Sequence, residues 1–189
     1  MKKIFPFLII LVFMVSCSLS DGLSALLDRI IAEKPAPVES NDIMTLIAND
    51  SISVISIRGN TIASTISGRT VDVELVNNTD QALEVIIPCG LIYIPTDEDA
   101  SRMISVQLHR ITFDAGETKT IKPFVLSMDN LKALPTADKT YRLELLTEGK
   151  QLEFANCLCM KDLPAEIETE ELISIQLAMW MIDESSIIT

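Results

Sequence analysis

Residue types that carry most enzyme chemistry are sparse in this sequence. It has one histidine, His109, in a stretch of alternating apolar and polar residues where a surface position on a strand is expected. The sequence has no glycine-framed serine nucleophile, no paired histidines of a zinc site and no glycine-rich phosphate loop. We therefore predict that the protein is not an enzyme, and we assign no catalytic residue.

Three consecutive acids, Asp97, Glu98 and Asp99, offer oxygen atoms of the kind that calcium prefers. Calcium loops place their ligands at alternating positions so that one loop wraps around the ion, whereas these acids are adjacent. A solvated loop is the expected structure. The sequence therefore predicts no metal site and no cofactor.

The N-terminus has the order of an export signal: Lys2 and Lys3, an apolar run, then Ser16 and Cys17. The run is shorter than the ~20 residues that cross a membrane, so cleavage after Ser16 is expected. Residues 14–17 resemble the lipobox of bacterial lipoproteins, which implies that Cys17 carries lipid. An ordinary secretory signal with a chance cysteine is the alternative. The resemblance predicts a lipid-anchored protein of the bacterial cell envelope, facing the periplasm or the exterior.

Lipidation of Cys17 leaves Cys89, Cys157 and Cys159, and so at most one intramolecular disulfide. Cys157 and Cys159 are too close in sequence for an easy bond with each other. Cys89 is therefore expected to pair with one of them, and we take Cys89 and Cys157 as the candidate pair. One thiol is then left over.

The net charge indicates which classes of binding partner are not expected. The whole chain carries 15 basic and 27 acidic side chains, a net charge of −12, and loss of residues 1–16 removes two lysines and gives −14. Nucleic acid and anionic head groups are bound through basic patches, so neither is an expected partner. The expected partners are the membrane, through the covalent lipid, and a protein or a ligand on a host surface.

The first structural element that the sequence predicts after the anchor is a helix. Apolar residues recur at spacings of three and four from Leu23 to Ile31, with Asp21 placed to cap, and Pro35 and Pro37 end the pattern. We expect a short amphipathic helix followed by a tether, with one or two further helical turns over 41–48. The domains are accordingly a signal peptide over 1–16, an anchor, helix and tether over 17–50, and a folded domain over 51–189.

From Ser51 the apolar period changes to two, which predicts strands. The short strands are evenly spaced with no helix between them, which favours a mainly β fold: an antiparallel, Ig-like β-sandwich with a C-terminal helix packed on it. Turn residues at 77–80 predict a hairpin, those at 114–117 predict a second tight turn, and Pro123 is expected at an edge or bulge. The expected strands begin at Ser51 and continue over 71–75, 83–87, 91–94, 103–108, 120–126 and 141–145.

The end of the chain reads as a helix, because acids over 166–171 precede a nearly continuous apolar stretch. Within it, Ile175, Gln176, Ala178, Met179 and Trp180 resemble the glutamine segment of bacterial thioester-domain surface proteins. In that family the glutamine side chain is joined to a cysteine, and the acyl bond captures host nucleophiles. The resemblance implies that Gln176 is one partner of a thioester.

Residues 70–135 resemble a β-sandwich segment of related surface proteins, through the stretches at 76–80, 87–90 and 115–118. The cysteine expected after the last stretch is missing, because residues 124–126 read Phe, Val and Leu. Cys159, or Cys157, is then the substitute thiol for Gln176. The alternative makes Gln176 a buried amide that is satisfied by backbone groups. A non-catalytic binding or structural protein is the first functional prediction, and a thioester adhesin, active or degenerate, is the second.

Overall fold

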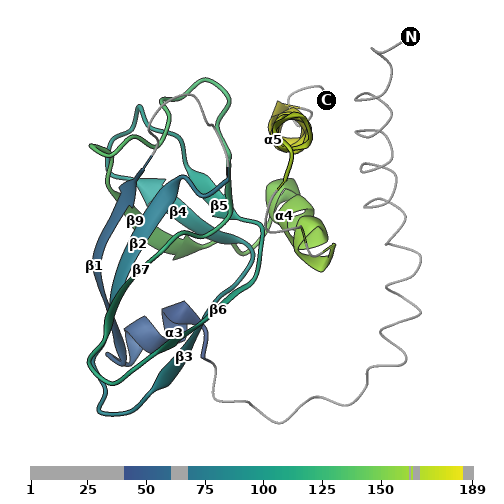
Figure 1. Ribbon diagram of the computed structural model, residues 1–189. Helices are drawn as coiled ribbons and strands as arrows, with labels where there is room; N and C mark the ends of the chain where they lie inside the picture. The colour runs from purple at the N-terminus through teal and green to yellow at the C-terminus, as the bar shows by residue number, and fades with distance from the viewer. Residues whose placement is uncertain (1–40, 61–67, 162, 164–166, 185–189) are drawn as a thin grey trace, which may run out of the picture.

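The computed structural model describes residues 41–60, 68–161, 163 and 167–184, and these form nine strands and three helices. The strands pair in antiparallel sheets, with a helical layer at the C-terminal end (Figure 1). The elements are α3 (Ile43–Ala48), β1 (Ile52–Gly59), β2 (Val71–Asn77), β3 (Leu83–Ile87), β4 (Leu91–Pro95), β5 (Met103–Ser105), β6 (His109–Phe113), β7 (Thr118–Ile121), β8 (Val125–Ser127), β9 (Tyr141–Leu145), α4 (Lys150–Met160) and α5 (Thr169–Glu184).

Two sheets enclose the main core. One has the strand order β1-β2-β7 and the other β8-β5-β4-β9. The alternation seen in sequence places Val71, Val73 and Leu75 fully inside, while Asp72 and Glu74 face outward. Tyr93 and Met103 enter the same core from the opposite sheet. The prediction of an antiparallel β-sandwich with a C-terminal helix is confirmed.

The two-stranded sheet β3-β6 continues the larger sheet as one long bent hairpin. Leu83 in β3 pairs with Phe113 in β6. Tyr93 in β4 lies ten residues after Leu83, and it pairs with Met103 in β5, which lies ten residues before Phe113. The register is therefore unchanged from β3-β6 to β4-β5. The bend falls at 88–90 on one strand and at 106–108 on the other, so the predicted strand over 103–108 is divided.

Two predicted strand arrangements were wrong. The residues at 77–80 do not form a hairpin, because both edges of β2 are occupied by β1 and β7, while β3 pairs with β6. Residues 77–80 instead carry the chain from β2 in one sheet to β3 in another. The buried Asn77 fixes this connection by donating to the carbonyls of Gln81 and Asp114, at 2.8 and 2.9 Å. The predicted strand over 120–126 is also two strands, β7 and β8, which lie in different sheets and are separated by the bend at Pro123.

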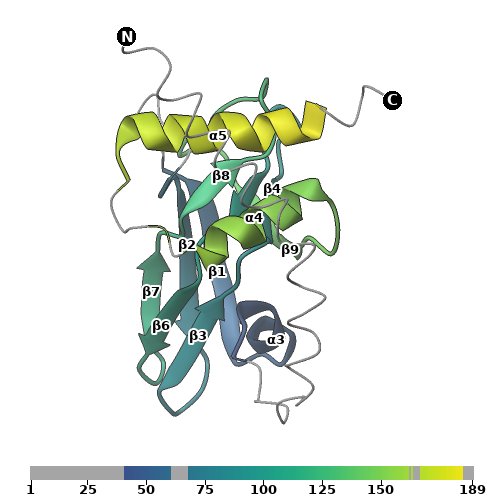
Figure 2. The same ribbon diagram turned by 90° about the vertical axis from the view of Figure 1, so that its right-hand side faces the viewer.

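A second core lies between the outer face of the larger sheet and the helices (Figure 2). Ile92, Ile104 and Leu126 meet Phe154 and Leu158 of α4 and Met179 of α5. Helix α5 was predicted from the sequence, whereas α4 was not. The apolar residues of α4 have helical spacing, so the missed signal was present at 152–158.

The folded domain begins before residue 51. Ile43 and Leu46 of α3 are buried in the main core, and the amide of Ile86 donates to the carbonyl of Asn41 at 2.8 Å. Residues 41–50, assigned to the tether, therefore pack with the sandwich, and the helical turns expected over 41–48 are present as α3. The expected signal peptide, Cys17, the expected helix over 23–31 and the tether up to 40 lie outside the described residues. Among the described helices, none is long and apolar enough to cross a membrane.

Candidate functional site

Gln176 bonds to the open edge of β8. Its side-chain oxygen accepts from the amide of Ser127 at 2.8 Å, and its side-chain nitrogen donates to the carbonyl of the same residue at 2.7 Å. The side chain is 1% exposed. An edge strand presents unpaired backbone groups that are costly when buried, and Gln176 pairs two of them. Gln176 thus has the buried, backbone-satisfied environment that was the alternative to thioester chemistry.

The same edge of β8 is also closed by Gly68, and a further bond from His109 satisfies the residue that precedes β8. Gly68 exchanges both backbone hydrogen bonds with Val125, each at 2.8 Å. The amide of Phe124 donates to Nε2 of His109 at 3.1 Å. The amides of Phe124, Val125 and Ser127 are therefore all satisfied without a further strand.

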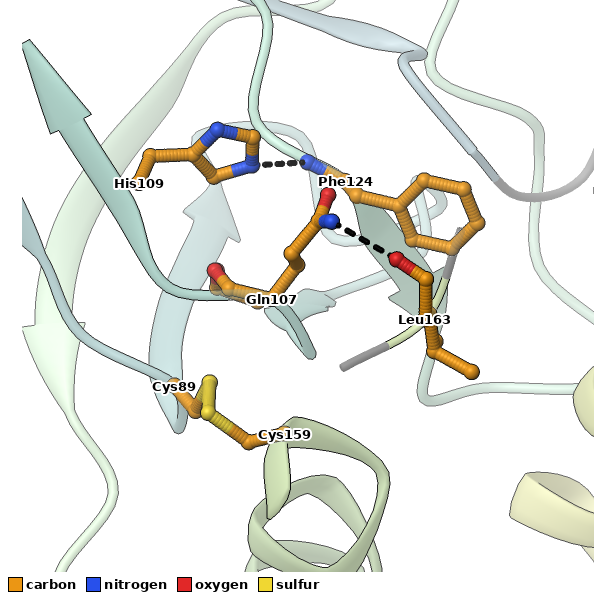
Figure 3. Close-up of a disulfide and its surroundings, with 7 residues drawn as sticks. Cys89, Gln107, His109, Phe124, Cys159 and Leu163 are labelled. Atoms are coloured by element: carbon orange, nitrogen blue, oxygen red, sulfur yellow. Dashed lines mark hydrogen bonds between the residues drawn. A yellow bond between two sulfur atoms is a disulfide. The ribbon is translucent and has the colours of Figure 1, made fainter. Parts of the chain in front are cut away.

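The disulfide joins Cys89 to Cys159 (Figure 3). It links the bend between β3 and β4 to the C-terminal end of α4, with 70 residues between the two cysteines. The candidate pair Cys89–Cys157 was therefore wrong. A sulfur bonded to another cysteine cannot hold an acyl group, so the structure gives no thioester between Cys159 and Gln176.

Helix geometry explains which cysteine meets Cys89. Positions 157 and 159 are two residues apart on α4, so their side chains point about 200° apart around the helix axis. Cys157 is buried, whereas Cys159 is half-buried and faces the bend. Cys157 is not a free thiol either, contrary to the expected leftover thiol.

His109 is held by the backbone beside this disulfide rather than facing solvent as a surface strand residue (Figure 3). Burial, and secondarily the charge of Arg69, lower the pKa of His109 below its usual 6.5. Because Nε2 accepts this hydrogen bond, the neutral form of the ring carries its proton on Nδ1. Gln107, also in this region, donates to the carbonyl of Leu163 at 3.0 Å. These two hydrogen bonds hold the polypeptide near the disulfide, and Nε2 of His109 is occupied by the amide of Phe124.

The three adjacent acids lie in a largely exposed loop, and one of them pairs with a lysine. Lys139 pairs with Asp97, and its hydrogen bond lowers the pKa of that carboxyl group. Lys132 donates to the carbonyl of Glu98 at 2.8 Å. Within the ranges that the structure describes, no group of three acidic, histidine or cysteine side chains is placed to hold a metal ion.

A groove on the outer face of β1-β2-β7 was not anticipated from sequence. It encloses about 580 Å³ between the sheet and the loop before β9. Gly59 makes this approach close, because a side-chain carbon there would lie 2.0 Å from the carbonyl oxygen of Pro135. The lining residues are Ile55, Ser56, Arg58, Gly59, Asn60, Asp72, Glu74, Thr120 and Ala137.

Polar side chains in the groove, together with the neighbouring Lys122, form an ordered set. Ser56 donates to Glu74 at 3.1 Å, Asn60 donates to Asp72, and Lys122 lies 3.6 Å from the same carboxylate. Arg58 is exposed in the same groove. The alternation over 71–75 places Asp72 and Glu74 on the outer face, but only the approach of the loop to Gly59 makes that face concave. This surface can bind a partner through charge and hydrogen bonds.

Comparisons of the chain with protein families, with curated proteins and with solved structures gave no match.

Proposed function

We propose that this protein is a lipid-anchored component of the bacterial cell envelope, with Cys17 as the lipidated residue. Its β-sandwich is a non-catalytic module that binds a partner through the groove on β1-β2-β7. The observation that carries the binding role is the groove itself, a concave face with an exposed cation and two carboxylates. Concave surfaces with a few convergent polar groups are the usual places for specific recognition.

The disulfide supports the envelope location. Cys89–Cys159 closes a long loop, and disulfides persist mainly in compartments outside the reducing cytoplasm. The export signal and the disulfide are independent features of the chain that agree on the compartment.

The chemistry of the groove favours a polar partner. Arg58 offers a planar, permanently charged donor group, and Asp72 and Glu74 offer acceptors beside it. A protein segment or a host-surface ligand that carries both donors and acceptors matches this set. The acidic chain makes nucleic acid a poor candidate.

The anchor is tested by expressing the full chain in bacteria that are fed radiolabelled palmitate. We expect the label on the protein and its recovery with membranes, and we expect both to be lost in Cys17→Ser. A protein that stays unlabelled and is released as a soluble species would contradict the anchor.

The groove is tested by placing a photoreactive amino acid at Ser56, and separately at the exposed Leu131, in living cells. A discrete cross-linked partner is expected from Ser56 but not from Leu131, and Arg58→Glu should abolish it. Absence of a discrete product at Ser56, or identical products at both positions, would contradict binding in the groove.

A further inference from the structure

Strand β1 is an edge strand with few of the usual protections of an edge (Figure 1). It is the outermost strand of the sheet β1-β2-β7, and only its far end is covered, where Arg58 forms a bridge with Thr140. Residues 51–57 include no charged residue and no proline, and a bulge between Val54 and Ser56 is the one protective device present. An open edge of this kind is a template for another strand.

The backbone groups of Ile52 and Val54 point away from β2. The carbonyl of Ser51 accepts from the amide of Asn78 at 2.9 Å, and alternate residues of an antiparallel strand bond to the same neighbour. Ser53 therefore bonds toward β2, while Ile52 and Val54 present two amides and two carbonyls at the open edge. None of the residues that the structure describes bonds to these four groups.

The apolar core is also incomplete beside this edge. Val54 pairs with the fully buried Leu75 but is itself 36% exposed, and Leu145 of β9 pairs with the fully buried Leu91 but is 44% exposed. Cross-strand partners lie on the same face of a sheet, so both exposed side chains are on the core side of their strands. Counted from the bridge that joins β1 to β9, Val54 is four residues away and Leu145 is five, which places them at similar levels.

We propose that an extended segment of a partner protein adds to β1 as a further strand. The segment turns aliphatic side chains toward Val54 and Leu145 and places a lysine or arginine over the groove. In this mode of recognition, main-chain hydrogen bonds supply affinity and alternate side chains supply specificity. The open part of β1, residues 52–56, is about 16 Å long at about 3.3 Å per residue. The inference rests on the proposed binding role of the groove and names its class of partner.

The basic side chain is expected because of Glu74. Ser56 donates to Glu74 at 3.1 Å, which holds that carboxylate toward β1. Asp72 already has Lys122 beside it, whereas no ion pair to Glu74 exists within the described part of the chain. An added strand would lie two strand spacings from β2, about 10 Å, which the side chains of a lysine and a glutamate span together.

A second copy of this chain fits the edge less well. Its own β1 has no basic residue over 51–57 to meet Glu74. Two copies that each carry a net charge of −12 also repel one another, whereas a basic segment is attracted.

The test places a photoreactive amino acid at Ile55 of the full chain in living cells, in two backgrounds. Val54→Ala and Val54→Pro both remove the valine side chain, but only proline also removes the amide that faces the open edge. We expect a cross-linked partner from the alanine variant and at least about tenfold less of it from the proline variant. Mass spectrometry of the product should identify a proline-free segment of alternating aliphatic and polar residues that includes lysine or arginine.

Glu74→Gln tests the charge without altering the backbone, because glutamine still accepts from Ser56. The yield should again fall at least about tenfold, while Glu84→Gln, which changes an exposed acid on β3, should leave it unchanged. Urea midpoints of all variants report on folding. If Val54→Pro lowers the midpoint, Glu74→Gln decides the matter, and an unchanged yield from it overturns the proposal.

Other outcomes separate this inference from the proposed function. Equal yields from Val54→Pro and Val54→Ala, with a product at Ser56 that Arg58→Glu still abolishes, would leave the groove as a binding site and overturn strand addition. A product of twice the mass of the chain would assign the edge to a second copy, and a link within one chain would assign it to the chain itself; either result overturns the proposal. Absence of any product at both Ser56 and Ile55 would contradict the binding role of the groove as well.

Discussion

Gln176 and His109 have related roles, since both satisfy backbone groups of the segment that runs into β8. Their partners, Ser127 and Phe124, are both buried. Residues of these types invite catalytic interpretations, yet each one is held by a hydrogen bond with the backbone. Gln176 bonds at the edge of β8, whereas His109 bonds the residue just before β8, whose carbonyl accepts from Val106.

Replacing Gln176 should destabilise the fold. Gln176→Ala leaves the amide and carbonyl of Ser127 buried without partners, which should lower the free energy of unfolding by about 1–3 kcal/mol. Urea denaturation measures the change. The matched control, Gln81→Ala, removes an exposed glutamine side chain and should change stability by less than about 0.5 kcal/mol. Equal effects of the two variants would show that the contacts with Ser127 do not matter.

His109 should make stability depend on pH. Its folded pKa is depressed, so when the pH falls below about 6.5 the unfolded chain takes up the proton before the folded chain does. Stability from this group is therefore complete above pH 6.5 and is lost as the pH falls toward the folded pKa. His109→Gln keeps an oxygen acceptor for Phe124 but cannot titrate. Urea midpoints measured from about pH 7 to about pH 5 should fall more steeply for the unaltered protein; parallel curves would refute this.

At the scale of elements, bends in the chain decide which strand belongs to which sheet. The hairpin from β3 to β6 keeps one register through its bend, and β7 and β8 separate at Pro123. Proline cannot donate to a ladder, so a strand is readily interrupted there. These bends carry the chain from one layer to the other.

Gly59 should be essential for the wall of the groove. Gly59→Ala forces a methyl group against the carbonyl of Pro135, so we expect a loss of about 1–3 kcal/mol and a displaced loop over 135–139. Gly116→Ala is the control, because that glycine has φ of +68° but no atom within 4 Å of an added carbon. It should lower stability by about 1–2 kcal/mol through backbone strain without moving the loop. Amide chemical shifts over 135–139 separate the two cases.

The disulfide should matter most for α4. Replacing both Cys89 and Cys159 by serine should lower the free energy of unfolding by about 2–5 kcal/mol, because the unfolded chain regains a long open loop. Amide exchange should accelerate in α4 more than in β1 and β2. Uniform acceleration in every element would indicate that the bond stabilises the domain as a whole, with no special effect on the attachment of α4.

Two cores share the larger sheet, with one on each of its faces. Tyr93 and Met103 point into the sandwich, whereas Ile92 and Ile104, next to them in sequence, point toward the helices. Both faces of β4 and β5 are therefore buried, which ties the helical layer to the sandwich. The molecule should behave as one cooperative unit.

Leucine truncations in the two cores test this cooperativity. Leu75→Ala in the first core and Leu158→Ala in the second should each lower stability by about 2–5 kcal/mol. Trp180 is the single tryptophan, so its fluorescence follows α5, while far-ultraviolet circular dichroism follows the whole domain. Both signals should move together in each variant. Separate transitions would mean that the helical layer unfolds independently.

The sequence by itself determined the local elements. Alternation over 71–75 and 141–145, the turn residues at 114–117 and the acidic start of α5 each depend on neighbours within a few residues, and the structure has all of these elements. The same local patterns also gave the antiparallel sandwich class. At 103–108 and 120–126 the patterns predicted strands that are too long. A period of two does not reveal where a strand ends or bends into another sheet.

Only the tertiary structure decided which distant segments meet. Periodicity could not tell that β2 pairs with β7 rather than β3, nor that Cys89 meets Cys159 rather than Cys157. The role of Gln176 depends on an edge strand 49 residues away, and the groove depends on a loop that approaches Gly59. Such contacts form because buried backbone groups and apolar faces must find partners anywhere along the chain, and a local pattern shows only that a partner is needed.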